Sequence, residues 1–447
     1  MQRVSRQYDS LPGPDFWLKA LSWTRQHFSV SCLLQSNGFT HDPYRRYDFL
    51  LGAGAAHECF DDGRDAFSCL KAFHEEHQDW MLGFLTYDLK NQYARLSSGH
   101  SDHIGMPGMH FFRPRVLISA SNESLEIACL PDTGLLGNPD RVLDAIINTR
   151  PASPQEVSGR FSPARMQPRV SGERYLSQLA HILNHIQLGD IYEMNYCTEF
   201  FAEHTRVDPL WLYQSLNRVS PTPFSAWYAL NERFLMCASP ERFLARRGNW
   251  LVSQPIKGTT ARHADVETDR KRAEMLRHDQ KERSENIMIV DLVRNDLSHC
   301  AEKASVQVEE LCEIYSFEQV HQMISTVKAS LRKDCHFTEA LRHAFPMGSM
   351  TGAPKIRAME LIEEYEDTRR GLYSGAVGYI DPQGDFDFNV VIRSLQYNAA
   401  EQYLNYMVGG AITIRSIPEK EYEECLIKAR AMEKALAAYS LQLTANS

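Results

Sequence analysis

The sequence predicts a large α+β protein whose antiparallel β-sheets form a sandwich-like core flanked by helices. Short apolar runs of strand length, separated by turn residues, recur along most of the chain. Segments predicted to be helical lie at about 171–188, 265–299 and after Pro418. The 447 residues are ample for a large core and suggest two or three domains.

Composition and charge exclude several classes of protein. Charged residues make up 23% of the chain, and the net charge of −9 comes without a basic cluster, which argues against a nucleic-acid partner. No apolar run approaches the roughly 18 to 20 residues of a membrane span. Residues 1–14 lack the apolar segment of a signal peptide. We therefore expect no membrane partner.

The ten cysteines are scattered and include no Cys-x-x-Cys pair, so their spacing does not suggest zinc. In a chain of this size they are typical of reduced, mostly buried thiols. We expect a cytoplasmic protein.

Residues 1–150 are predicted to form an N-terminal region that packs on the rest of the chain. It holds short apolar runs and one helix. The expected strands are 28–34, 46–51, 116–119 and 125–130, with a helix at 58–80 ahead of an apolar run at 81–87. Residues 151–169 contain four prolines and little periodicity, which predicts a linker. Residues 170–447 would then form the catalytic region.

The second region begins with a helix and a series of strands. Ser171 is expected to cap a helix that ends at Gly189-Asp190, and a strand follows from Ile191. Further strands are predicted at 234–238, 242–245, 250–253, 373–380, 386–395 and 403–408, the last ending in Gly409-Gly410. Pro354 suits the first turn of a helix that runs to about Glu366.

The register of the strands around Gly248-Asn249 decides whether two polar residues meet. A two-residue turn would pair Glu241 with Ile256 and point Glu241 and Lys257 to opposite faces. A three-residue loop would place the two side chains across from each other on one face. An acid and a lysine that act together would need the second register, or a bulge.

Lys257 lies in the stiff sequence Gln254-Pro-Ile-Lys-Gly258. Proline restricts the backbone before the lysine, and Gly258 allows a sharp turn or a close approach to a ligand. A lysine held in this way and desolvated could act as a nucleophile. An isolated motif of this kind is more often a surface lysine at the end of a strand.

Two helices each carry a pair of carboxylates on one face, Glu282 with Glu285 and Glu421 with Glu424. Four carboxylates brought together would repel one another unless a cation lay between them. Magnesium prefers such oxygen ligands and completes its shell with water and an anionic substrate. By spacing alone, two solvated helix faces are the commoner explanation.

Other segments could bind a substrate. Residues 348–355 are glycine-rich and open a helix, so free N–H groups there could hold an anion, although the Walker pattern is missing. Arg393 could bind a carboxylate through two hydrogen bonds. The Gly409-Gly410 backbone could approach a ligand closely. His321 lies in a semi-apolar stretch, where a packed core histidine is the commoner case.

Taken together, the motifs resemble those of the chorismate-utilising enzymes. This family contains anthranilate synthase, aminodeoxychorismate synthase, isochorismate synthase and salicylate synthase. The resemblance is strong from Ser171 to the C-terminus and weaker at 33–51. It rests on the order and spacing of GDIYEMN (189–195), SPERF (239–243), PIKGT (255–259), ENIMIVDLVRND (285–296), His321, GSMTGAPK (348–355), YSGAVGY (373–379), VVIRS (390–394) and Glu421-x-x-Glu424-x-x-x-Lys428.

Within the family, Lys257 favours the aminodeoxychorismate synthases, which aminate chorismate at C4. Anthranilate and isochorismate synthases generally carry a small or apolar residue at this position. Isochorismate and salicylate synthases place a water-activating lysine where this chain has Glu193. The aminating members commonly have glutamine there, so Glu193 departs from the pattern.

The resemblance implies a cofactor and roles for particular residues. Mg²⁺ would be held by Glu285 and Glu424, with Glu282 and Glu421 helping through water. Lys257 would add to C2 of chorismate while Glu241 protonates the leaving C4 hydroxyl. His321 would lie close to that hydroxyl.

The resemblance also implies how the substrate is bound. Arg393, Tyr373 and the Gly409-Gly410 backbone would hold the enolpyruvyl carboxylate. Thr351 would hold the ring carboxylate, and Lys428 belongs to the same substrate-binding set.

A partner and a second ligand are implied as well. We find no glutamine amidotransferase signature, so ammonia would come from a separate glutamine amidotransferase subunit. Ser36, Pro221 and Phe224 match the place where relatives bind tryptophan, and ordinary loop packing would explain these residues equally well.

Three alternatives stay open at this point. The first is an anthranilate synthase component I, which releases 2-aminobenzoate and pyruvate. The second is an isochorismate-type synthase, disfavoured by Glu193 and Lys257. The third is a ligand-binding protein without catalysis, against which the acids at 241, 285, 421 and 424 argue. A fused lyase that releases 4-aminobenzoate would need an additional domain.

Overall fold

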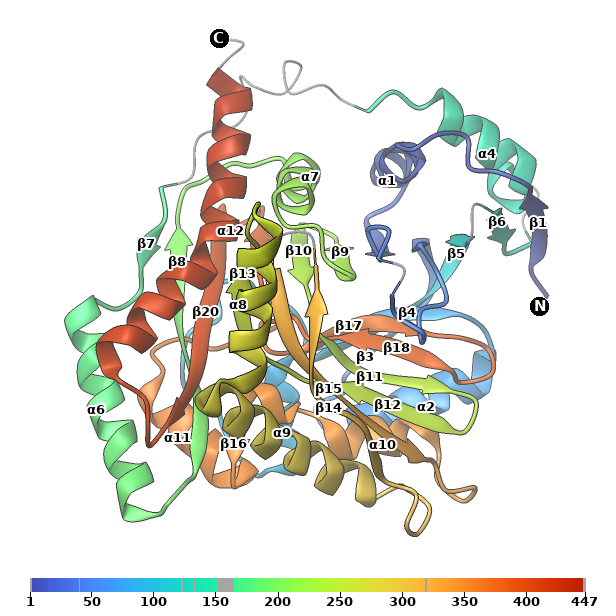
Figure 1. Cartoon of the computed structure of the whole chain (residues 1–447). Helices are drawn as coiled ribbons and strands as arrows, with labels where there is room; N and C mark the ends of the chain where they lie inside the picture. Colours follow the sequence, from blue (N-terminus) through green and yellow to red (C-terminus); the bar gives the residue numbers. More distant parts are fainter. Residues whose placement is uncertain are drawn as a thin grey trace.

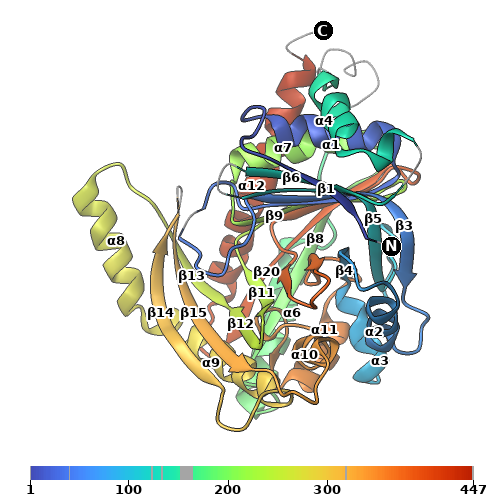
Figure 2. The same ribbon diagram turned by 90° about the vertical axis from the view of Figure 1, so that its right-hand side faces the viewer.

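The computed structural model describes residues 2–39, 41–121, 124–131, 134–151, 165–317 and 320–444. Its strands pair antiparallel into one continuous sheet that divides at strand β5 (Met109–Ser121) into two arms. Residues 152–164 of the predicted linker lie outside the described residues. Figures 1 and 2 show the sheet from two sides.

The first arm contains more of the described strands than the second, and each pairs with the next. From the edge inward they are β1 (Val4–Tyr8), β6 (Ser124–Cys129), β5, β3 (Phe49–Phe60), β2 (Val30–Gln35), β9 (Phe224–Leu230), β10 (Arg233–Ser239), β19 (Ser394–Asn398), β20 (Tyr403–Thr413) and β8 (Glu193–Ala202). The two-residue strands β7 (Gln167–Pro168) and β16 (Gly352–Ala353) pair with β8. Strands from both sequence regions therefore share one arm, because β2 pairs directly with β9.

The second arm continues from the other end of β5. Its strands are β4 (Met81–Leu85), β17 (Ala376–Ile380), β18 (Phe386–Asn389), β11 (Arg242–Arg247), β12 (Trp250–Gln254), β15 (Val320–Ser330), β13 (Ile256–Ala261) and β14 (Gln307–Ser316). Again the two sequence regions meet, since β4 pairs with β17.

Buried side chains between the two arms make the sandwich that the sequence predicts. Cys32 and Tyr228 of the first arm share one hydrophobic cluster with Phe84 and Val377 of the second. The neighbouring Trp227 belongs to the larger cluster on the other face of the first arm, because successive strand residues point to opposite faces. The predicted fold class, antiparallel sheets in a sandwich flanked by helices, is confirmed.

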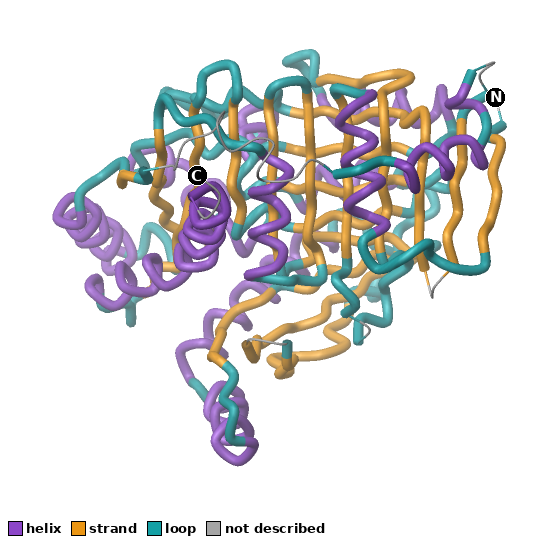
Figure 3. The backbone as a smooth tube through the Cα atoms, turned by 90° about the horizontal axis from the view of Figure 1, so that it is seen from above, coloured by secondary structure: helices purple, strands orange, loops and turns teal. Residues whose placement is uncertain are grey.

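Helices cover the outer faces of both arms, and Figure 3 shows several of them lying across the row of strands. The larger cluster joins the first arm to α1 (Phe16–His27), α4 (Pro139–Asn148), α6 (Gly172–Leu188), α7 (Pro209–Val219), α11 (Lys355–Tyr365) and α12 (Pro418–Thr444). A third cluster joins the second arm to α2 (Ala66–His77), α9 (Gln280–Ser298) and α10 (Phe337–Ala344). The other α-helices in the described residues are the short α3 (Lys90–Tyr93) and α8 (Val266–His278), which stands away from the body in Figure 2.

Local signals predict several boundaries correctly. The Ser171 hydroxyl accepts a hydrogen bond from the Arg174 amide at the start of α6, and Gly189 ends this helix with φ +82°.

All ten cysteines are free, and eight of them are buried, which confirms the expectation of mostly buried thiols. No helix in the described part of the chain is long and apolar enough to cross a membrane.

Several predicted elements have different bounds in the structure: the predicted strand 386–395, for example, is two strands, β18 and β19. Two further cases show the reason. Residues 58–60 belong to β3 rather than to a helix, because this strand continues along β5 and pairs Phe60 with His110. The predicted strand at 403–408 runs on through Gly409 and Gly410 to Thr413, because β20 stays paired with β8 over that whole length. Neither pairing is visible in the local sequence.

Candidate active site

A cavity of about 440 Å³ lies between the two arms of the sheet, and we call it the central cavity. Asn195 of β8 and Gly409 of β20 line it from the first arm, and Lys257 of β13 lines it from the second. Helices α9 and α12 contribute the carboxylates. Of the predicted site residues, the structure brings together Glu241, Lys257, Tyr373, Arg393, Gly409, Lys428, Glu282, Glu285, Glu421 and Glu424.

A β-bulge places Glu241 and Lys257 on the same cavity wall. Arg247 pairs with Trp250, so Gly248-Asn249 is a two-residue turn. The register then shifts by one residue between Ala245 and Arg242, and Arg242 pairs with Gln254. From the sequence, either a three-residue loop or a bulge could place the two side chains on one face. The structure has the bulge.

Glu241 is a buried carboxyl suited to proton transfer near neutral pH. Glu241 is only 4% exposed. Burial raises the pKa of Glu241 to about 7, and the nearby Ser349 hydroxyl and the Lys257 charge oppose that rise. A carboxyl with this pKa can hold a proton and release it at physiological pH.

The four carboxylates of α9 and α12 border the same part of the central cavity. Burial and the charges of Glu285 and Glu424 raise the pKa of Glu282 to about 7. The Lys281 ammonium lies 3.0 Å from a Glu421 oxygen and 3.8 Å from a Glu285 oxygen. Lys428, 2.8 Å from Glu424, is the main cause of the lowered pKa of Glu424.

This donor set fits a magnesium ion that takes much of its coordination from other ligands. One buried Glu285 oxygen has no hydrogen-bond partner within the described chain. Yet no three His, Cys, Asp or Glu side chains among the described residues are grouped closely enough to hold an ion by themselves. Magnesium keeps several waters and substrate oxygens in its shell, so two or more separate carboxylates suffice.

Arg393 supplies a positive charge to the wall of the cavity. It follows β18 with a backbone φ of +52°, an unusual conformation for a residue other than glycine. Burial lowers the pKa of Arg393 below its usual value, and no carboxylate in the described residues forms an ion pair with it. A planar guanidinium in this position can bind a substrate carboxylate bidentately. Tyr373, 3% exposed, lines the cavity beside it.

Lys428 ties α12 to the glycine pair of β20. Its ammonium donates a hydrogen bond of 2.9 Å to the Gly409 carbonyl. A Cβ atom at Gly409 would lie 2.4 Å from the Tyr196 carbonyl oxygen, whereas one at Gly410 would meet nothing closer than the Lys428 nitrogen at 3.6 Å. The two glycines therefore have different functions: the first allows strand pairing, and the second leaves space next to the cavity.

This difference gives a matched prediction. Gly409→Ala is expected to destabilise the protein by about 1–3 kcal/mol, because the methyl group overlaps the backbone of β8. Gly410→Ala is expected to keep the melting temperature and to raise KM for the substrate, since its methyl group points toward Lys428. Thermal unfolding and steady-state kinetics of both variants check this. Equal melting temperatures for the two variants would contradict the assignment.

Three predicted residues do not line the central cavity. The His321 ring bonds Asp269 at 3.0 Å and Ser316 at 2.8 Å, so both of its nitrogens have partners. The Thr351 hydroxyl donates to backbone carbonyls of its own loop. Their neighbours Gln322 and Ser349 line the cavity instead. Gly410 is the third residue that does not line the cavity. Direct contacts of the substrate with His321, Thr351 and Gly410 remain predictions, and this geometry does not support them.

Several lining residues carry no signal in the sequence, and Glu193 departs from the family pattern without an explanation there. Asn195, Ser349 and Gln322 sit inside or beside recognised motifs, but nothing in their spacing marks them as cavity residues. Glu193 is 1% exposed on β8, and one of its carboxylate oxygens has no described partner. Burial raises the pKa of Glu193, and the charge of Lys257 opposes this rise. The glutamate that stands where the aminating members commonly have glutamine therefore lies near Lys257.

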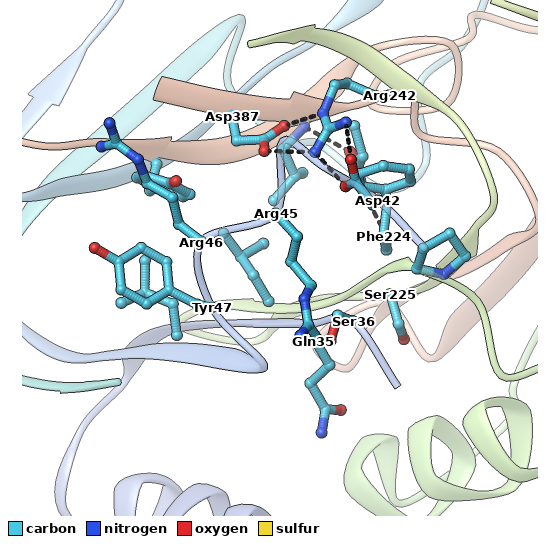
Figure 4. Close-up of a pocket in the computed structure, with 16 residues that line it drawn as sticks. Gln35, Ser36, Asp42, Arg45, Arg46, Tyr47, Phe224, Ser225, Arg242 and Asp387 are labelled. Atoms are coloured by element: carbon cyan, nitrogen blue, oxygen red, sulfur yellow. Dashed lines mark hydrogen bonds and ion pairs between the residues drawn. The ribbon is translucent and has the colours of Figure 1, made fainter. Parts of the chain in front are cut away.

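A separate pocket between the N-terminal region and the second region contains two of the three residues predicted to bind tryptophan. Ser36 and Phe224 line it together with charged residues that the sequence did not indicate (Figure 4). Arg242 forms paired hydrogen bonds to Asp42 and Asp387 at its back. Pro221 lines another cavity. We call this the N-terminal pocket.

The antiparallel sandwich and its charged central cavity are those of an enzyme that acts on a small anionic substrate. The family model described as chorismate binding enzyme matches residues 35–434. The chain belongs to this family of chorismate-utilising enzymes, and the family predicted from its motifs is confirmed.

Curated relatives come from two branches of the family. Anthranilate synthase component 1 of Thermus thermophilus is 36% identical over 80% of this chain and 77% of its own length. Aminodeoxychorismate synthase component 1 of Escherichia coli strain K12 is 33% identical, with the same coverage of both chains. Aminodeoxychorismate synthase of Streptomyces griseus is 39% identical over 66% of this chain, which spans only 40% of that protein.

A solved structure supports the fold. Anthranilate synthase component I of Streptococcus pneumoniae superposes with a TM-score of 0.73 at 27% identity, covering 88% of this chain and 93% of the other. Because the chain is similar to both branches, its overall identity to relatives does not show which reaction it catalyses. That assignment depends on the residues of the central cavity.

Proposed function

We propose that this chain aminates chorismate at C4 to give 4-amino-4-deoxychorismate, the reaction of an aminodeoxychorismate synthase component 1. The observation that carries the proposal is Lys257, which lines the central cavity on the same wall as the buried acid Glu241. A nucleophile and a proton donor on one wall suit a displacement through a covalent adduct.

The first displacement would form an adduct with the lysine. The neutral Lys257 amine adds to C2 of chorismate, the two ring double bonds shift, and the C4 oxygen leaves as water with the proton from Glu241. The new C2–N bond thus replaces the C4–O bond, and no oxidant or reductant is needed. Arg393 and Tyr373 hold the enolpyruvyl carboxylate so that C2 faces Lys257.

The second displacement would release the product. Ammonia adds to C4, the double bonds shift back, and the C2–N bond to Lys257 breaks. Two successive shifts explain why the amino group ends at C4 rather than at C2. Glu241, left ionised by the first step, accepts the proton that ammonia loses.

The carboxylates of α9 and α12 would hold Mg²⁺, with Glu285 and Glu424 as direct ligands and Glu282 and Glu421 acting through water. When bound, the ion would neutralise the ring carboxylate of chorismate and make C2 more electrophilic. The Glu285 oxygen that lacks a hydrogen-bond partner and the mutual repulsion of Glu282, Glu285 and Glu424 support this assignment.

Ammonia is proposed to come from a separate glutamine amidotransferase subunit. Support comes from the relatives named component 1, a name that implies a second component for those proteins. A cytoplasmic location, where thiols stay reduced, is consistent with ten free cysteines.

The experiment that tests the proposal is turnover of chorismate by the purified chain with Mg²⁺ and ammonium at mildly alkaline pH. The expected product is converted to 4-aminobenzoate by a 4-aminobenzoate-forming lyase, and chelation of Mg²⁺ abolishes turnover. A fluorescent 2-aminobenzoate peak would instead assign the chain to the second candidate, anthranilate synthase component I, which the relative from Thermus favours.

For the N-terminal pocket we predict binding of an aromatic amino acid such as tryptophan. The pocket combines apolar walls with Arg45, Arg46 and Asp42. These groups form ion pairs within the chain, so the carboxylate and amine of the ligand would have to share them. Isothermal titration with L-tryptophan is expected to show binding that Ser36→Leu weakens at least tenfold by filling the space. Pro221→Ala, outside this pocket, is the control, and absence of heat with the wild type would refute the prediction.

A further inference from the structure

A second cavity of about 180 Å³ opens beside the central cavity, and we call it the side cavity. It lies between the segment 219–222 after α7, the start of β15 and one face of α12. The two cavities have six lining residues in common, so they are neighbouring parts of one hollow: Pro240, Thr259, Val320, Gln322, Arg393 and Ile427.

The side cavity is positively charged. Its described lining residues include Arg393, Arg430 and Lys434 and no carboxylate. Arg430 and Lys434 lie four residues apart on α12 and therefore on one face of the helix. Both are exposed, and neither has an ion-pair or hydrogen-bond partner within the parts of the chain that the structure describes. The positive charge of this cavity is opposite in sign to the net charge of the chain, −9.

Helix α12 connects this basic region to the acidic part of the central cavity. Glu421 and Glu424 lie near its start, and Lys434 follows them at a distance of about 15–20 Å along the helix at 1.5 Å per residue. None of the four metal-site carboxylates lines the side cavity. Arg393 lines both cavities, so it lies where the basic side cavity joins the central one.

We propose that the side cavity is the entrance through which the dianionic substrate reaches the central cavity, with Arg430 and Lys434 attracting it and Arg393 receiving it. The proposal rests on the central cavity being the chorismate site, and it holds whichever product is formed. The net negative charge of the chain repels a dianion, so a local pair of unpartnered cations would select the route of approach. Such fields raise association rates by about 10- to 1,000-fold at low salt.

The test compares two double variants that each remove two exposed positive charges. Arg430→Gln/Lys434→Gln changes the side cavity. Lys303→Gln/Lys333→Gln is the control, since both lysines are exposed and line neither cavity. Chorismate consumption is measured at fixed ammonium while sodium chloride raises the ionic strength from about 0.1 M to about 0.5 M, which shortens the screening length from about 10 Å to a few ångströms.

The side-cavity variant is expected to lose at least threefold in kcat/KM for chorismate at the lower ionic strength and less than twofold at the higher. Its kcat and melting temperature should stay at the wild-type values, and the control should match the wild type. An unchanged kcat/KM, an equal loss in both variants, or a loss that is the same at both ionic strengths would overturn the proposal. Because the readout is loss of chorismate, a wrong assignment of the C4 product would not affect it.

Discussion

Lys257→Ala is expected to lower the rate of 4-amino-4-deoxychorismate formation by at least about 10³-fold. Removal of a catalytic nucleophile from an enzyme costs this much or more, since no other group in the site replaces the covalent step. The substitution removes one half-exposed side chain from the edge of β13, so the melting temperature should change little. The measurement is the rate at which 4-amino-4-deoxychorismate forms from chorismate at saturating ammonium, with the products separated by chromatography.

Lys257→Arg is the matched control, because it keeps the positive charge in the cavity but cannot form the adduct. Both variants should be equally inactive if the amine is a nucleophile. If arginine restored most of the activity, Lys257 would contribute only charge. If Lys257→Ala released 2-aminobenzoate from chorismate, the lysine would be the feature that directs the reaction to C4.

Glu241→Gln is expected to lower kcat by about 10²- to 10⁴-fold, the range for loss of a general acid. The raised pKa of Glu241, about 7, also sets the pH dependence. The protonated carboxyl is the acid, so the rate of the first displacement should fall as pH rises through about 7. Rates are compared between pH 6 and pH 9 at a constant concentration of free ammonia. A wild-type decline that persists in Glu241→Gln would belong to another group.

The same substitution is expected to stabilise the folded protein at alkaline pH. The pKa of Glu241 rises from 4.5 to about 7 on folding, so its contribution to stability is present below pH 4.5 and is lost as pH rises through 7. At pH 8.5 the buried carboxylate costs about 3 kcal/mol, which an uncharged glutamine avoids. Thermal unfolding at pH 5 and pH 8.5 should show a gain for Glu241→Gln that is larger at the higher pH.

An opposite effect on activity and on stability would indicate that Glu241 is retained for chemistry. A buried acid that served only the fold would lower stability when neutralised. Equal gains at both pH values would mean that the carboxyl ionises normally in the folded protein.

Local sequence signals determined a large part of this protein. The capping serine of α6, the glycine that ends it and the turn at Gly248-Asn249 are all where the local chemistry of these residues predicts them. The family and ten of the residues that line the central cavity also followed from the sequence, because motifs such as PIKGT and the paired glutamates keep their order and spacing. These features depend on residues near one another in the chain, so the sequence alone could determine them.

The tertiary structure decided what depends on distant segments. The bulge that brings Glu241 and Lys257 to one wall arises from pairing of β11 with both β12 and β18. The extension of β3 and β20, and the orientation of His321 toward Asp269 of α8, depend on neighbours far away in sequence. Likewise the basic side cavity exists only because α12, the start of β15 and residues 219–222, which are far apart in sequence, line one hollow. Side-chain burial and strand register are properties of the folded chain, and a linear pattern of residues does not fix them.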